Sequence, residues 1–170
     1  MNDARREIER MGIRVVFKNH ELVKECVACY NVVVNGKAII AASWLDIPTG
    51  EIWLSEYYQE FSDYILFHEL QEIKYRASGH DPETAHLLAL EDECKEFAGD
   101  PKWEKLRRDI NVCSFDMLLS VPGIGGVLAH RIVENRPYSS LREIGRLRGI
   151  GPRRYATISR TFWCAGDRVS

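Results

Sequence analysis

An internal duplication with an offset of 26 residues, in the last third of the chain, constrains the fold more than any other feature. Residues 115–132 resemble residues 141–158, and each copy contains a Gly-Ile-Gly triplet, at 123–125 and at 149–151. Apolar residues recur at helical spacing on both sides of each triplet, which predicts helix, tight turn and helix in each copy. Glycine tolerates a left-handed turn and leaves the amides at the next helix start uncovered, which suits a phosphate group.

The two copies differ where their second helices begin. Val127 and Leu128 follow the first hairpin, whereas Arg153 and Arg154 occupy the corresponding positions after the second. Arginine presents a planar fork of N–H donors that suits phosphate oxygens. The second hairpin is therefore predicted to be the better phosphate binder, and the first to serve the fold or a partner contact. A purely structural repeat used for protein contact is the alternative.

Four short motifs in the last third carry a resemblance to a known family. They are N-x-x-S at 111–114, P-G-I-G at 122–125, A-x-x-I-x-x-x-R at 129–136 and G-I-G-P at 149–152. With them, residues 110–162 resemble a tandem helix-hairpin-helix domain of the competence-protein (ComEA-like) type. The resemblance implies sequence-independent binding to the backbone of double-stranded DNA, with one hairpin approaching each strand. The residues expected to contact DNA are Gly123, Gly125, Gly126, Gly149, Gly151, Arg153 and Arg154.

The distribution of charge indicates two parts with different partners. Residues 1–109 carry a net charge of −7, residues 110–170 carry +5, and every Lys/Arg cation of the second part is an arginine. Such a basic part favours a polyanion, while the overall pI near 6.2 argues against nonspecific coating of DNA by the whole chain. We therefore predict a first domain at 1–109 and an all-α DNA-binding domain at 110–170.

The first domain begins with strand patterns and continues with helix patterns. Asn35-Gly36 between two apolar runs predicts a hairpin, because both residues tolerate positive φ. Two helices follow, from about residue 58 to 77 and from Asp81 to about 98. The predicted fold class is α+β: a small, mainly antiparallel sheet with packed helices, followed by the all-α domain. The predicted strands are 13–17, two runs within 27–43, and 51–54.

Two histidines and two glutamates gather in these two predicted helices. His68 and Glu72 are four residues apart, so they point the same way from the first helix. If the helices pack antiparallel about a loop near residue 80, His86 lies beside Glu72 and Glu93 lies beside His68. Two imidazoles and a carboxylate that meet at one point make a zinc site with an open position for water. The candidate metal ligands are therefore His68, Glu72, His86 and Glu93, and this geometry leaves open which carboxylate completes the set.

The start of this cluster also resembles a catalytic motif. His68-Glu69-x-x-Glu72 resembles the His-Glu-x-x-His motif of zinc metallopeptidases, and residues 27–97 are similar to minimal zincin-like proteins with His-Glu-Leu-x-Glu and a later Ala-His. The resemblance implies zinc or another divalent metal on His68 and His86, with Glu72 as a possible third ligand and Glu93 as a spare ligand or supporting carboxylate. It implies Glu69 as the base that activates water. Glu72 replaces the second histidine of the motif, so neither zinc nor peptidase activity follows from the motif alone.

Other interpretations of these residues stay open. Glu83-x-x-His86 has the spacing of di-metal carboxylate bundles, which need a second copy and two more helices. Cys26-x-x-Cys29 occurs once, outside the setting of known redox motifs, and the cysteines are interpreted mainly as reduced thiols. The His/Glu cluster can also be a solvated acidic face in which His68 is a hydrogen-bonded, partly buried side chain.

Together these features lead to a hypothesis about function. The leading hypothesis is a DNA-associated, metal-dependent hydrolase of the peptidase type that acts on proteins held at DNA. The alternative is a noncatalytic DNA-binding or DNA-repair accessory protein whose first domain docks a partner. A metal-dependent nuclease fits less well, because the cluster lacks the acidic set of a two-metal site. No apolar run is long enough for a membrane span and no signal-peptide pattern occurs, so we expect a cytoplasmic, nucleoid-associated protein.

Overall fold

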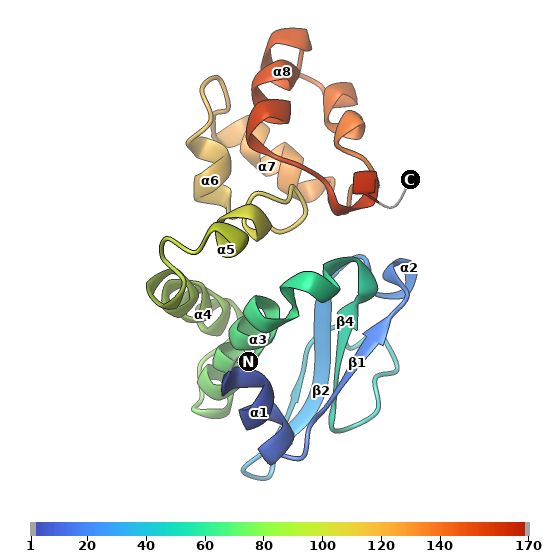
Figure 1. Ribbon diagram of the computed structural model, residues 1–170, viewed down its shortest axis with the longest axis vertical. Coiled ribbons are helices and arrows are strands. Elements are labelled where there is room, and N and C mark those ends of the chain that lie inside the picture. Colours follow the sequence, from blue (N-terminus) through green and yellow to red (C-terminus); the bar gives the residue numbers. More distant parts are fainter. Residues whose placement is uncertain (1–2, 169–170) are drawn as a thin grey trace. The chain divides into compact units, whose positions relative to one another are not determined.

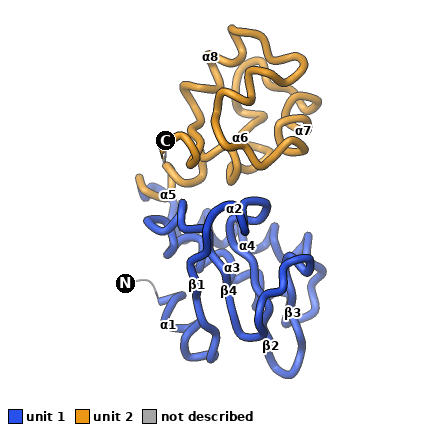
Figure 2. The backbone as a smooth tube through the Cα atoms, turned by 90° about the vertical axis from the view of Figure 1, so that its right-hand side faces the viewer, with its two compact units in different colours: residues 1–100 blue, residues 101–170 orange. Residues whose placement is uncertain are grey.

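The computed structural model describes residues 3–168 and divides the chain into two compact units, Met1–Asp100 and Pro101–Ser170 (Figure 2). The division falls at the start of the helix that precedes the duplication, so residues 101–109 pack with the second unit. The domain boundary predicted after residue 109 lies a little further along the chain, at the end of the segment that leads into the duplication.

The first unit contains a four-stranded mixed sheet in the order β1-β4-β2-β3 (Figure 1). The strands are β1 Arg14–Lys18, β2 Ala28–Val34, β3 Lys37–Ile40 and β4 Glu51–Ser55. β2 pairs antiparallel with β3, as the hairpin predicted, and also with β4, whereas β1 pairs with β4 in parallel. The sheet is thus mainly antiparallel, as predicted. Its parallel pair arises because the chain returns after the hairpin and inserts β4 between β1 and β2, in the direction of β1.

Local sequence explains the hairpin and the central strand of this sheet. Asn35 and Gly36 have φ of 52° and 76°, the left-handed values that a two-residue turn of this kind requires, so the predicted hairpin is confirmed. β4 has a neighbouring strand on each side and is buried at every position, so both faces of the sheet are covered there. Tyr30 of β2 is fully buried and lies on the strand beside it.

Five helices accompany the sheet: α1 Asp3–Arg10, α2 His20–Val23, the 3-10 helix η1 Glu56–Phe61, α3 Ser62–Ala77 and α4 Pro82–Glu96. α3 packs against β2, β3 and α1, so it covers the sheet (Figure 1). Leu66, Leu70 and Ile73, spaced at helical intervals, form its buried face and are at most 1% exposed. The two predicted helices are thus confirmed, with η1 as a tighter entry to the first.

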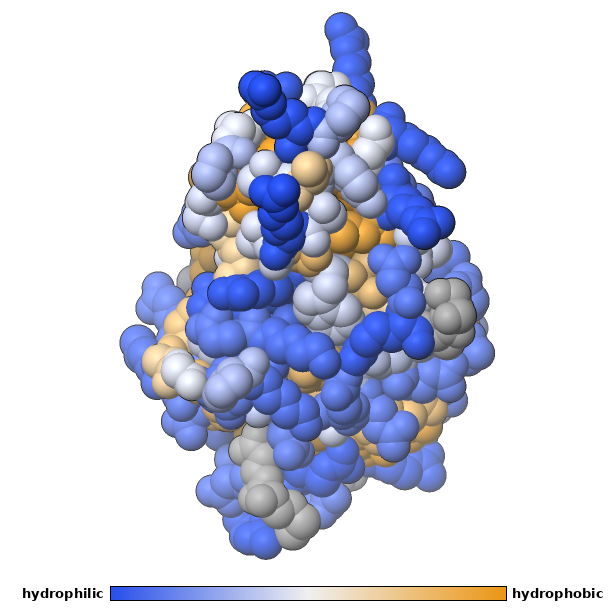
Figure 3. All heavy atoms as spheres, turned by 45° about the horizontal axis from the view of Figure 1, so that its top comes forward, coloured by the Kyte–Doolittle hydropathy of each residue, from blue (hydrophilic) through white to orange (hydrophobic). Residues whose placement is uncertain are grey.

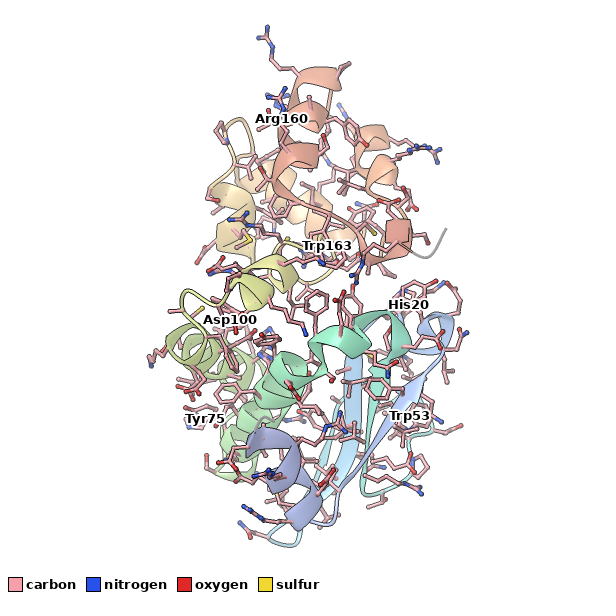
Figure 4. The ribbon with its side chains drawn as sticks, in the orientation of Figure 1. His20, Trp53, Tyr75, Asp100, Arg160 and Trp163 are labelled. Carbon is pink, nitrogen blue, oxygen red and sulfur yellow. The ribbon has the colours of Figure 1, made fainter. Side chains whose placement is uncertain are left out.

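α3 and α4 form the helix pair that carries the His/Glu cluster. Gly79, with φ of 111°, ends the first helix, and the Asp81 side chain accepts from Thr84 N at 3.0 Å to begin the second. Tyr75 of α3, labelled in Figure 4, donates its hydroxyl to Asp92 of α4 at 2.6 Å. This contact joins the last turn of α3 to the second half of α4.

The second unit is all-α and contains the duplication. Its elements are α5 Pro101–Leu106, α6 Phe115–Leu119, α7 Gly126–Glu134, the 3-10 helix η2 Leu141–Arg146, α8 Pro152–Thr161 and the 3-10 helix η3 Ala165–Arg168. One apolar core joins both copies, with Leu118 and Ile144 at equivalent positions and both 0% exposed. The predicted helix-turn-helix pattern is confirmed in both copies, except that a 3-10 helix opens the second. Of the helices in residues 3–168, none has the length and apolar character needed to cross a membrane.

A buried aspartate joins the first and last segments of the second unit. Asp109 is 0% exposed and accepts from the backbone amides of Asn111 at 2.7 Å and Ala165 at 2.8 Å. Beside it, Ile110 N donates to Trp163 O at 2.8 Å, and the Trp163 indole (Figure 4) donates to Lys105 O at 2.7 Å. The segment before the duplication is therefore tied to the segment after it.

Candidate functional site

The hairpins of the second unit have the backbone that their glycines predict. Gly123 has φ of 86° and Gly149 has φ of 91°, a region that L side chains rarely adopt. Gly125 and Gly151 then stand at the N-caps of α7 and α8 and are exposed. Because α8 begins with Pro152, which has no N–H, the amides that an anion can approach are those of Gly126 and Val127 in α7 and of Arg153 and Arg154 in α8.

The hairpins also pack against each other through the positions at which the copies differ. A Cβ atom added at Gly149 would lie 2.9 Å from Leu128 Cδ2, and one added at Gly123 would lie 3.8 Å from Arg154 Cγ. Leu128 and Arg154 are equivalent in the duplication. The second helix of each copy therefore packs on the glycine turn of the other copy, through leucine in one case and arginine in the other.

Arg154 has a structural role that the sequence did not indicate. Its Nε donates to Gly123 O at 3.1 Å and its Nη1 donates to Gly149 O at 2.9 Å, so one guanidinium joins both hairpin turns. Arg131 of α7 crosses in the other direction and donates from Nη1 to Arg148 O. A guanidinium has five N–H groups, so Arg154 retains three beyond these two bonds. Its contact with DNA phosphate stays a prediction.

Exposed arginines surround the second hairpin. Arg146 and Arg148 lie just before or within its turn, Arg153 lies just after it, and all three are exposed. Arg160, labelled in Figure 4, is exposed on the last turn of α8. Strongly hydrophilic side chains project from this unit in Figure 3. The second hairpin therefore combines bare helix amides with guanidinium groups, the two kinds of group that bind phosphate in proteins.

In the first unit, three predicted metal ligands meet in a small triangle of donor atoms. His68 Nε2 lies 3.1 Å from His86 Nδ1, His86 Nδ1 lies 3.1 Å from Glu72 Oε2, and His68 Nε2 lies 3.6 Å from Glu72 Oε2. Zinc bonds near 2.0–2.1 Å at tetrahedral angles give ligand-to-ligand edges of about 3.3 Å. Donor chemistry and spacing thus fit a zinc-sized ion on one side of the triangle, whose three residues are also the potential metal-binding group found among residues 3–168.

Further side chains hold two of these three donors in place. Glu93 Oε2 lies 3.1 Å from His68 Nδ1, the ring nitrogen that faces away from the triangle. Tyr30 donates its hydroxyl to Glu72 Oε1 at 2.5 Å, and Arg76 Nη1 donates to the Tyr30 oxygen at 2.9 Å. The structure shows both predicted pairings, His86 with Glu72 and His68 with Glu93. It places Glu93 as a supporting carboxylate rather than at the triangle.

Tyr30 and Arg76 are site residues that the sequence analysis missed. Tyr30 lies in β2 and is 0% exposed, and it is separated from Glu72 by 42 residues. A tyrosine in an apolar strand has the pattern of a core residue, so no local signal marks it. Arg76 is one helical turn from Glu72, and its spacing of four residues was the one available signal.

The charge state of the cluster follows from these contacts. Burial would lower the pKa of His68, but hydrogen bonds to Glu72 and Glu93 outweigh it and raise that pKa to about 10. Burial would raise the pKa of Glu72, yet hydrogen bonds from the two histidines and Tyr30 hold it well below its usual range. Without a metal, His68 is protonated and Glu72 ionised near neutral pH. A metal at the triangle would replace that proton.

Glu69, the predicted base, follows His68 on α3 and interacts electrostatically with His68, Glu72 and Glu93. Burial, the largest effect, raises its pKa to about 8, while the charge of His68 opposes the rise. Its charge also acts on Tyr30 and on the thiols of Cys26 and Cys29. A carboxyl group that titrates near neutral pH is suited to general acid–base work, and its catalytic role stays a prediction.

The other candidate groups in the first unit have ordinary surroundings. Cys26 and Cys29 are free thiols that pack with Val23, Ile47 and Trp53 in one apolar cluster. A hydrogen bond between them lowers the pKa of the Cys26 thiol and raises that of Cys29. Glu83 is exposed in the first turn of α4, and the triangle instead contains Glu72 beside His86.

Comparisons with known proteins bear on the second unit. A family model described as the helix-hairpin-helix motif matches residues 107–162, a range that includes both hairpins and the helices from α6 to α8. No curated protein matches the chain, and no solved structure does either. The predicted zincin-like character of the first unit and its metal therefore stay proposals. Residues 107–162 contain a helix-hairpin-helix motif, and this motif indicates nucleic-acid binding.

Proposed function

We propose that the second unit binds the phosphate backbone of double-stranded DNA without sequence preference. The match of residues 107–162 to the helix-hairpin-helix motif carries this proposal. Two glycine turns with positive φ, the amides of Arg153 and Arg154 in the first turn of α8, and exposed arginines at the second hairpin support it. These groups recognise phosphate rather than base edges, so affinity would depend strongly on salt and weakly on sequence.

Charge reversal at the second hairpin tests this function. The double variant Arg148→Glu, Arg153→Glu is expected to bind a short duplex at least about tenfold more weakly than the wild type at low salt, because two phosphate contacts become repulsive. Fluorescence anisotropy of labelled duplex provides the measurement. The control is Arg6→Glu, Arg10→Glu, which makes the same charge change on exposed positions of α1. Equal weakening by both double variants would mean that binding reflects net charge and not the hairpin.

A second candidate function concerns the first unit: a metal-dependent hydrolase of the peptidase type that acts on proteins held at DNA. The triangle of donor atoms, with edges of 3.1, 3.1 and 3.6 Å, favours it. His68, Glu72 and His86 would hold zinc or another divalent metal, which when bound would polarise a carbonyl or lower the pKa of a water molecule. A zincin-like relationship of the fold is part of this proposal.

Other residues would position the metal ligands and accept a proton from water. Glu93 accepts from His68 Nδ1, which fixes the ring so that Nε2 faces the triangle. Tyr30 holds the second oxygen of Glu72 and leaves Oε2 for the triangle. Glu69 would take a proton from water, since a pKa of about 8 makes its carboxylate basic enough to do so.

Metal binding is tested on the full chain by thermal denaturation with added zinc, manganese or magnesium. Zinc is expected to raise the melting temperature of the wild type and of His80→Ala, because a ligand that binds the folded state alone stabilises it by mass action. The melting temperature of His86→Ala should not change when zinc is added, because this variant lacks a ligand. His86 and His80 are both exposed histidines of the α3–α4 segment, which makes the pair well matched. A wild type insensitive to all three ions would exclude the metal site.

The two hypotheses for the first unit separate at the next step. If zinc binds and Glu69→Gln abolishes cleavage of an unfolded protein substrate while zinc binding persists, the hydrolase proposal stands. If the wild type binds zinc but cleaves nothing with or without DNA, the first unit is instead the partner-docking domain of a noncatalytic DNA-repair or DNA-binding accessory protein.

A further inference from the structure

The charge difference between the two hairpin copies extends well beyond the turn. Six arginines of the second copy lie at positions where the first copy has no cation, and two of the equivalent residues are acidic. All six arginines are exposed, and so are five of the six equivalents. The pairs are Asp116 and Arg142, Ser120 and Arg146, Pro122 and Arg148, Val127 and Arg153, Leu128 and Arg154, and Glu134 and Arg160.

The arginines that the first copy does contain are used inside the unit. Arg131 Nη1 donates to Arg148 O, so it supports the second hairpin. Arg136 Nη2 donates to Cys113 O at 2.8 Å and contacts Cys113 Sγ at 2.9 Å. Both side chains are half-buried. These two arginines are bonded within the unit, as Arg154 is in the second copy. The other five exposed arginines of the second copy have no counterpart at the first hairpin.

Apolar side chains occupy the first hairpin's surface instead. Val127 is 72% exposed at the place of Arg153, and Leu119 is 42% exposed at the end of α6. Leu128 packs on Gly149, as Arg154 packs on Gly123. The exposed carboxylates of Asp116 and Glu134 would repel a phosphate chain that approached this copy.

We infer that the second unit holds a single phosphodiester strand, through its second hairpin, and that the first hairpin adds no ionic contact to DNA. This inference rests on the proposed DNA binding and narrows its ligand. A domain with two equal hairpins would engage both strands of a duplex, as the family resemblance implies. Here the exposed guanidinium groups belong to one copy: Arg154, which also bonds the two hairpin turns, and five more arginines. A single strand is therefore a sufficient ligand, and a duplex is bound through one of its strands.

Matched substitutions at one pair of equivalent positions test the inference. Arg153→Glu and Val127→Glu each place a carboxylate at the second residue of the helix that follows a hairpin. Arg153→Glu is expected to weaken binding to a short single strand and to its duplex by about tenfold, whereas Val127→Glu changes either affinity by less than about twofold. The wild type is expected to bind single strand and duplex within about threefold of each other at low salt.

The reverse substitution sharpens the distinction. Val127→Arg adds a cation to the first hairpin at an exposed position, so it should strengthen duplex binding about threefold to tenfold while leaving single-strand binding unchanged. Equal losses from Val127→Glu and Arg153→Glu on duplex, or a wild type that binds duplex far more tightly than single strand, would overturn the one-strand inference. A wild type that binds neither DNA would instead refute the proposed function on which the inference rests.

Discussion

Replacing Asp109 with alanine is expected to lower the free energy of unfolding of the second unit by about 3–5 kcal/mol. Asp109 is 0% exposed, and its two carboxylate oxygens accept from the amides of Asn111 and Ala165 at 2.7 and 2.8 Å. Alanine leaves both amides buried without these acceptors and opens a cavity. Since a small domain has a total stability of roughly 5–15 kcal/mol, a large share of the unit would unfold on warming.

Hydrogen exchange across residues 101–168 checks this prediction, because it reports the second unit separately from the first. Asp109→Asn should lose less stability than Asp109→Ala, since the asparagine amide retains one acceptor oxygen and replaces the other oxygen with an NH₂ donor. The control is Asp116→Ala, which removes an exposed carboxylate from α6 and should change stability by less than about 0.5 kcal/mol. DNA affinity should fall with the unfolded fraction. Unchanged protection in Asp109→Ala would show that the ends of the unit are not joined through this carboxylate.

Features that depend on a few adjacent residues were predictable from sequence. The turn at Asn35-Gly36 and the start of α4 at Asp81 follow from backbone preferences that neighbours do not override. The glycine turns at Gly123 and Gly149 belong to the same class, and both have the expected positive φ. The facing positions of α3 and α4 also followed from counting along two helices joined by a short loop, which is why both histidine–glutamate pairs were anticipated.

Features that depend on contacts between distant segments were not predictable. β4 has the same apolar pattern whether it pairs parallel or antiparallel with β1, because the pattern records burial and not direction. Tyr30 meets Glu72 only because α3 packs across β2. Arg154 shows the same limit. From sequence, an arginine that follows a glycine turn is interpreted as a phosphate ligand. Its bonds to Gly123 O and Gly149 O could not be predicted, because they form only when the two hairpins pack together.

The pH dependence of the His/Glu cluster provides the second prediction, beginning with the metal-free protein. The pKa of His68 is raised from 6.5 to about 10, so its stabilising effect is complete below 6.5 and is lost as pH rises through 10. The pKa of Glu69 is raised from 4.5 to about 8, so its contribution also declines with rising pH, between those values. The pKa of Glu72 is lowered from 4.5, so its contribution is present above 4.5 and is lost on acidification. Without metal, the stability of the first unit should therefore peak near pH 4.5. Above that it should decline, first through Glu69 alone and more steeply above pH 6.5, where His68 adds to the loss.

The affinity for zinc is expected to rise with pH, whereas the stability of the metal-free unit falls. A metal needs the neutral imidazole of His68, which holds its proton up to about pH 10 in the free protein, so binding must release that proton. The apparent zinc affinity should accordingly rise about tenfold per pH unit, or about a hundredfold between pH 6 and 8. Calorimetric titration in buffers of different ionisation enthalpy measures both the affinity and the number of protons released.

Glu93→Gln tests the cause of this trend. Removing the carboxylate beside His68 Nδ1 should bring the pKa of His68 down and flatten the pH dependence. The same change should weaken zinc binding by about tenfold to a hundredfold at the alkaline end, because the ring loses the carboxylate that orients it. His80→Gln, an exposed histidine of the loop between α3 and α4, should retain the full slope. A merely structural Glu93 would weaken zinc equally at every pH, so an unchanged slope in Glu93→Gln would refute the assigned pairing of proton and metal at His68.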